Sequence, residues 1–160
     1  MDGSKFTTRS VEVINAAHTL AVTAGNPQVE PAHLAAALLR QDQGIAPAIL
    51  SKAGVDPAGL AGRIDSELAQ LPSASGSTVQ NPATSPGLTR VLAKALELAE
   101  EMKDDFIATE HLLLALATVE GPVQVAFHQS GADVGPLRAA ITAVRGNRHV
   151  TSQDAEATYE

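Results

Sequence analysis

Apolar positions recur at intervals of three and four residues along most of this chain, which is the spacing of one face of an α-helix. A first helix begins after Thr7 or Thr8, either of which can cap it, and the Gly-Asn-Pro stretch at 25–27 ends it. Three more helices follow in the same half, over 31–40, 44–53 and 56–71, bounded by proline, glycine or aspartate. The first half therefore reads as four helices.

The helical pattern stops at residues 72–84, which are rich in Pro, Ser, Gly, Asn and Thr and are predicted to be a linker. It restarts at Ser85-Pro86, where serine caps a helix and proline opens it. Four helices are predicted from there, over 86–102, 110–119, 122–131 and 133–145, with Thr109 and Asp133 as expected caps. Residues 147–160 are polar, and we expect them to be a flexible tail.

The two halves resemble each other residue by residue. A shift of 78 places His111 on His33, Ser85 on Thr7 and Leu92 on Ile14, and a shift of 77 aligns the later helices after one gap. Because a lone half of this size would leave an apolar face open, the halves should pack together. The prediction is an all-α fold of two pseudo-twofold-related four-helix repeats, about 6–71 and 85–146, within one domain of residues 1–147.

Composition removes several classes of function. The net charge is −7 and no run of Lys or Arg stands out, which argues against nucleic-acid binding. The chain has no cysteine, so disulfides and thiolate chemistry are excluded. There is neither a secretory signal nor an apolar run of the ~20 residues that span a bilayer, so we expect a cytoplasmic protein that does not enter membranes. No phosphate-binding loop accompanies any lysine.

The adjacent Glu110 and His111 are the most reactive-looking pair. No nucleophile or metal-ligand motif accompanies them, and His33 stands at the same place in the first half. We therefore expect both histidines to bond the backbone at a helix start, with no catalytic residue and no metal site. Glu110 has two open interpretations, a helix-dipole partner or a functional carboxylate.

Comparison of the two copies indicates a second candidate surface. Four positions are more apolar in the second copy: Leu96 against His18, Phe106 against Gln28, Leu113 against Ala35, and Val119 against Gln41. These side chains either form an exposed groove that binds unfolded chains or helices, or fill the interface between the halves.

The stretches "EPAHLAAALL" and "ATEHLLLALA", the opening "FTTRSVEVINAA" and the "LPSASG" linker together resemble the N-terminal domains of ClpB-type protein disaggregases, especially actinobacterial ones, within the Clp N-terminal repeat family. The resemblance covers essentially the whole chain. It implies a monomeric domain that binds unfolded or aggregated polypeptide weakly and passes it to the pore of a hexameric ATPase. ATP and Mg would belong to ATPase rings beyond this chain, whose end would be the start of a linker to them, and the DnaK chaperone system would be a partner.

The resemblance also implies site residues. In this family a threonine at the start of the first helix and an Asp and Glu around the second repeat's helix start are functional; here they are Thr7, Asp104 and Glu110, with Leu92 matched to a groove position. The related ClpC-type domains, which bind adaptors or phosphoarginine, are the alternative. They carry Thr-Glu-His in both repeats. Since Ala32 replaces one glutamate here, at most one such site would remain, at Ser85 and Glu110.

Overall fold

The computed structural model describes residues 3–73 and 81–156. The first repeat contains a 3-10 turn, four α-helices and a short strand: η1 (Gly3–Lys5), α1 (Thr8–Ala24), β1 (Gln28–Val29), α2 (Pro31–Arg40), α3 (Ala46–Lys52) and α4 (Pro57–Ala69). The second contains β2 (Ala83–Thr84), α5 (Pro86–Glu101), α6 (Thr109–Thr118), α7 (Pro122–Gln129) and α8 (Val134–Arg145). The predicted all-α architecture of two four-helix repeats is confirmed.

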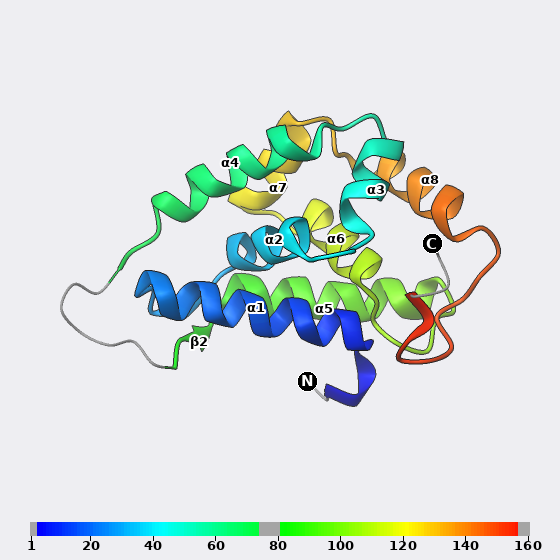
Figure 1. Cartoon of the computed structure of the whole chain (residues 1–160), viewed down its shortest axis with the longest axis horizontal. Coiled ribbons are helices and arrows are strands. Elements are labelled where there is room, and N and C mark those ends of the chain that lie inside the picture. Colours follow the sequence, from blue (N-terminus) through cyan, green and yellow to red (C-terminus); the bar gives the residue numbers. More distant parts are fainter. Residues whose placement is uncertain (1–2, 74–80, 157–160) are drawn as a thin grey trace.

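The helices form three layers (Figure 1). The central layer consists of α2 and α6, with α1 and α5 on one side and α3, α4, α7 and α8 on the other. Residues 32–38 of α2 and 109–117 of α6 are buried without interruption. Most of these side chains are alanine or leucine, and small residues allow neighbouring helices to approach closely. The two central helices are equivalent in the repeats, so the core is common to both halves.

Helix starts follow the predicted caps with two exceptions. The hydroxyl of Thr7 accepts from the Ser10 N–H, and that of Ser85 accepts from the Leu88 N–H, as caps do. At α6 the helix begins one residue early, so Thr109 is its first residue and not its cap. Asp133 holds the cap position of α8, but makes no capping hydrogen bond there.

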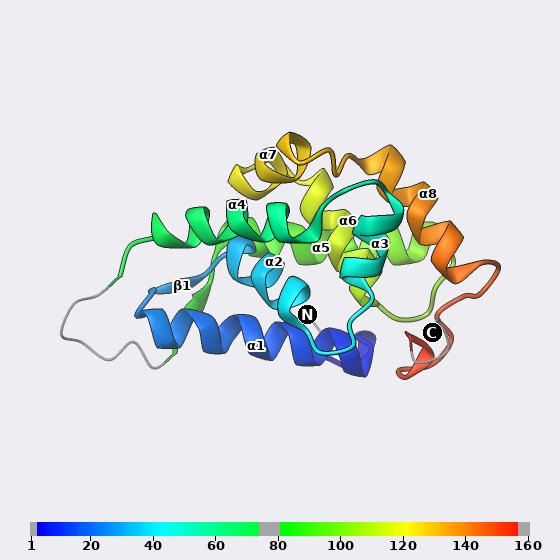
Figure 2. The ribbon, with the colours of Figure 1, turned by 45° about the horizontal axis from the view of Figure 1, so that its top comes forward.

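Each repeat pairs its leading segment with the other repeat, which the periodicity did not predict. β1 and β2 form a two-stranded parallel sheet in which Val29 pairs with Thr84, visible beside α1 in Figure 2. An isolated parallel bridge pairs Phe6 with Ile107. The shift of 78 converts one pair into the other, so the exchange of segments follows the internal symmetry.

The tail differs from its expectation. Residues 147–156, predicted to be the flexible start of a linker, lie against the folded domain, with Val150, Ala155 and Glu156 buried. The Thr8 N–H donates to the Gln153 carbonyl at 2.9 Å, which ties the tail to the start of α1. Of the predicted linker 72–84, residues 74–80 lie outside the described residues, as do residues 157–160 of the tail.

None of the helices that the structure describes has the length and apolar character to cross a bilayer.

Candidate functional site

The two repeat histidines make matching hydrogen bonds. Nδ1 of His33 and of His111 each accepts, at 2.8 Å, the backbone N–H of the residue three positions earlier. Nε2 of His33 lies 2.8 Å from Oδ1 of Asn26, and Nε2 of His111 lies 2.7 Å from Oδ2 of Asp104. Since Nδ1 is an acceptor, each ring carries its proton on Nε2 and donates it to that side chain. The predicted hydrogen bond of both histidines to the backbone at a helix start is confirmed.

The Asp104 carboxylate accepts hydrogen bonds from donors that have no equivalent at Asn26. It accepts Arg145 Nη2 at 2.6 Å and Nη1 at 2.9 Å, and the Val150 N–H at 2.9 Å. Burial favours the neutral acid, but hydrogen bonds from His111, Arg145 and Val150 outweigh it and hold the pKa of Asp104 well below its usual range. This is a bidentate, buried ion pair between the start of the second repeat's core and the end of α8.

Glu110 is fully buried beside this pair. Its Oε2 lies 3.3 Å from Nη1 of Arg145, within ion-pair distance, yet neither carboxylate oxygen accepts a hydrogen bond from the described residues. The distance and the missing hydrogen bond are compatible, because an ion pair needs proximity but not alignment. Burial raises the pKa of Glu110, and the carboxylate of Glu156 adds to the rise, while His111 and Arg145 oppose it.

The tail brings a second carboxylate to the start of α6. Oε2 of Glu156 accepts the Thr109 N–H at 2.9 Å and the Thr109 hydroxyl at 2.6 Å. A carboxylate at a helix N-terminus satisfies an otherwise unpaired N–H and interacts favourably with the helix dipole. Thr109, predicted to be a cap, is thus itself the group that binds the tail.

Because each leading segment pairs with the other repeat, Thr7 and Ser85 each lie beside the repeat to which they do not belong. The Thr7 N–H donates to the Ile107 carbonyl at 3.0 Å, which places Thr7 beside the second repeat, and it is buried there. The Ser85 N–H donates to the Val29 carbonyl at 3.0 Å, beside the first repeat. The predicted pairing of Ser85 with Glu110 is therefore not supported by any contact among the described residues. Thr7, Asp104 and Glu110 all lie inside the fold.

The predicted apolar residues divide between surface and core. Leu113 is 1% exposed, so the expectation that it lines a binding groove is wrong: it lies on α6, which is covered from both sides. Phe106 and Leu96 are half-buried and pack against the core. Leu92 is half-buried and lines a hollow between α1 and α5 together with Ile14 and His18, which we call the α1–α5 hollow.

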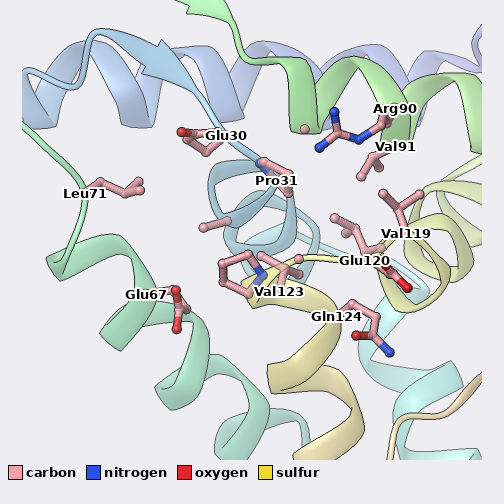
Figure 3. A pocket seen from close by; sticks show the side chains of 15 residues that line it. Glu30, Pro31, Glu67, Leu71, Arg90, Val91, Val119, Glu120, Val123 and Gln124 are labelled. Carbon is pink, nitrogen blue, oxygen red and sulfur yellow. The ribbon is translucent and has the colours of Figure 1, made fainter.

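An open groove, here the α2 groove, lies at the start of α2 (Figure 3). Its apolar walls include Pro31, Leu71, Val91, Val119 and Val123. Glu30, Glu67, Glu120 and Arg90 lie around it, and none of these four takes part in an ion pair within the part of the chain that the structure describes. The groove is thus apolar inside and carries three carboxylates against one guanidinium.

The counterpart of this groove lies at the start of α6 and is filled. It is lined by Arg9, Gln41, Gln43, Gly44, Ile45 and Thr109, and the shift of 78 places every one of them on a residue that lines the α2 groove. The remaining lining residue is Glu156. The tail therefore fills in the second repeat a site that is open in the first, and we call this site the α6 groove.

Sequence reasoning missed three of the residues that build these sites. Arg145 was not predicted to belong to any site, and Glu156 was expected to be part of a flexible tail. Asn26 was read only as part of a helix stop, although its alignment with Asp104 was available as a signal. Within residues 3–73 and 81–156, no group of three or more His, Cys, Asp or Glu side chains could hold a metal ion.

Comparison with known proteins agrees with this internal symmetry. Residues 5–130 match the model of the Clp repeat (R) N-terminal domain. The chain belongs to the Clp N-terminal repeat family. This Clp repeat domain is 39% identical over 160 residues to the chaperone protein ClpB of Mycobacterium tuberculosis strain H37Rv, a match that covers 100% of the chain and 19% of the relative. It is 43% identical over 160 residues to ClpB 1 of Parasynechococcus marenigrum, covering 98% of the chain and 18% of that relative.

The Clp repeat domain spans about a fifth of the length of these curated relatives. Among solved structures, the Hsp104 N-terminal domain from Candida albicans superposes with a TM-score of 0.83 at 24% identity, covering 94% of this chain and 98% of that one. A ClpV N-domain in complex with a VipB peptide gives a TM-score of 0.65 at 21% identity, covering 86% and 85% of the two chains. At these identities the structures show a shared fold. The predicted ClpB-type chaperone N-domain is confirmed at the level of family.

Proposed function

We propose that this chain is the part of a ClpB-type chaperone that engages unfolded or aggregated polypeptide weakly and presents it to the pore of an ATPase ring. The observation that carries the proposal is the α1–α5 hollow, where Leu92, Ile14 and His18 are only half-buried. A shallow apolar surface of this kind binds chains with little sequence preference, because burial of apolar area is non-directional.

The identity to proteins named chaperone ClpB supports this proposal, and so does the complex of a ClpV N-domain of the same fold with a VipB peptide. In this proposal ATP and Mg act in the ATPase rings and not in this domain. Hexamer formation and cooperation with the DnaK system, both in the cytoplasm, are features of the whole protein, whereas the domain by itself is monomeric.

The test is an NMR titration of the isotope-labelled domain with a permanently unfolded protein, such as reduced and carboxymethylated α-lactalbumin. Shifts should concentrate at Leu92, Ile14 and their neighbours, and Leu92→Gln should weaken the binding while circular dichroism shows an unchanged fold. Val125→Gln, on the exposed surface of α7, is the matched control and should bind like the parent. Binding that Leu92→Gln leaves unaltered would remove the hollow from the mechanism.

The phosphoarginine alternative finds no support in the geometry at Glu110. A guanidinium already lies against that carboxylate, because Arg145 Nη1 is 3.3 Å away, and both side chains are buried. A free phosphoarginine would have to displace Arg145 from its bidentate pair with Asp104. We therefore expect phosphoarginine to shift no resonance near Ser85 or Glu110 in the same titration.

A further inference from the structure

We propose that the α2 groove is a second docking site, specific for a polypeptide segment that presents an apolar side chain next to a lysine or arginine. The site is distinct from the α1–α5 hollow, and the proposal stands whether or not the hollow binds clients. It rests on the filled counterpart in the second repeat and on the charges around the open copy.

The α6 groove shows that this place in the fold accepts a segment of polypeptide. The tail reaches it after a backbone hydrogen bond from the Thr8 N–H to the Gln153 carbonyl. It then inserts Glu156, whose carboxylate accepts two hydrogen bonds from Thr109. The ligand in that copy is thus a short stretch of chain anchored by one charged side chain, and the internal symmetry presents the same kind of concave site in the first repeat.

The α2 groove cannot take an acidic anchor in the same way. Pro31 stands where Thr109 stands in the other copy, so both the backbone N–H and the hydroxyl that hold Glu156 are missing. An incoming carboxylate would also meet Glu30, Glu67 and Glu120. Like charges repel, and a carboxylate that loses its hydration without gaining hydrogen-bond donors is destabilised.

A basic anchor meets the opposite conditions. The three rim carboxylates have no ion-pair partner among the described residues and can accept an ammonium or guanidinium group. Beneath them, half-buried Pro31, Leu71 and Val119 offer apolar surface to a neighbouring side chain. Among the described residues, Arg90 is the one cation on the rim, and it limits the preference for basic segments. Apolar contact would supply affinity and the rim would select the sign of the charge.

The experiment compares two fluorescent decapeptides that share a central Leu-Val pair, one flanked by lysines and the other by glutamates. We expect the lysine peptide to bind more tightly, with methyl shifts at Val91, Val119 and Val123. Reversal of two rim charges, Glu67→Lys with Glu120→Lys, should weaken the lysine peptide at least about fivefold, and Arg90→Glu should strengthen it about twofold. The difference between the peptides should shrink as salt screens the rim.

Controls separate this site from general electrostatics and from the hollow. Glu97→Lys with Glu100→Lys makes the same change in net charge on the exposed surface of α5, and should leave the binding within about twofold of the parent. Leu92→Gln should leave the peptide-induced methyl shifts at Val119 and Val123 unchanged, so failure of the hollow and failure of this groove give different results. Equal binding of the two peptides, or equal effects of the rim and α5 reversals, would overturn the proposal.

Discussion

Asn26 and Asp104 occupy equivalent positions, and their partners explain why the side chains differ. Beyond its histidine, Asn26 faces an acceptor, since its Nδ2 donates to the Pro72 carbonyl at 2.8 Å. Asp104 faces only donors, namely its histidine, Arg145 and the Val150 N–H. An amide, which can donate and accept, suits the first site, and a carboxylate, which only accepts, suits the second.

Exchange of these two side chains should therefore destabilise the protein at both sites. Asp104→Asn turns an amide group toward donors and leaves Arg145 buried without its full counter-charge, which should cost about 3–5 kcal/mol. Asn26→Asp sets a carboxylate against the Pro72 carbonyl and should cost about 1–3 kcal/mol. Urea denaturation of the two variants measures both losses. Asp105→Asn, on an exposed neighbour, is the control, and a loss at Asp104 no larger than this one would contradict the assignment.

The raised pKa of Glu110 predicts that its contribution to folding stability changes with pH in the opposite direction to that of most carboxylates. Because burial raises its pKa in the folded protein, the native state retains a proton that the unfolded chain has released above about pH 4.3. This group therefore lowers stability as pH rises through the folded pKa. Glu110→Gln should remove the effect, so its stability relative to the parent should increase between about pH 4 and the folded pKa. Stability curves that run parallel from pH 4 to 8 would exclude the effect; Glu100→Gln on the surface is the reference.

At the scale of elements, the helices could be predicted because caps and breakers coincide with the apolar period. The β1–β2 pair could not, since two residues carry no periodicity and their pairing depends on the other half of the chain. The tail was misjudged for a related reason. Its composition is polar, and its order depends on a few anchors, Val150, Ala155 and Glu156, whose partners lie in distant segments.

The same limit applies to the candidate site. Family resemblance pointed to Thr7, Asp104 and Glu110, and the structure places all three inside the fold. It could not show that Arg145 comes from the far end of the second repeat to pair with two of them. Leu113 was misplaced because a more apolar copy can fill an interface as well as a groove, and sequence alone left both interpretations open.

The tail should contribute measurably to the stability of α6. Glu156→Ala removes the acceptor of the Thr109 N–H and hydroxyl, which are buried, and should cost about 1–3 kcal/mol. Hydrogen exchange of the Thr109 amide should accelerate with it. Asp154→Ala, an exposed residue of the same segment, should change neither quantity, and an unchanged Thr109 exchange rate in Glu156→Ala would show that the tail does not hold the helix.

At the scale of the whole molecule, the contacts between the halves lead us to expect one cooperative unit. Each supplies a leading segment to the other, through the pairs Val29–Thr84 and Phe6–Ile107, and α2 contacts α6 at the centre. If one half unfolded alone, the backbone groups that pair with it in the other half and the shared core surface would both be exposed. We therefore expect no stable state in which only one repeat is unfolded.

Matched cavities in the two central helices test this directly. Leu34 and Leu112 are equivalent by the shift of 78, and both are at most 1% exposed. Alanine at either position should cost about 2–5 kcal/mol, whereas Leu39→Ala, at a half-buried position on α2, should cost less. In both core variants, the slowest-exchanging amides of α2 and α6 should lose protection by the same free energy, because only global unfolding exposes them. If Leu34→Ala accelerated hydrogen exchange in the first repeat alone, the repeats would be separate folding units that merely contact each other. The pairing of each leading segment with the other repeat would then follow from docking of two folded repeats.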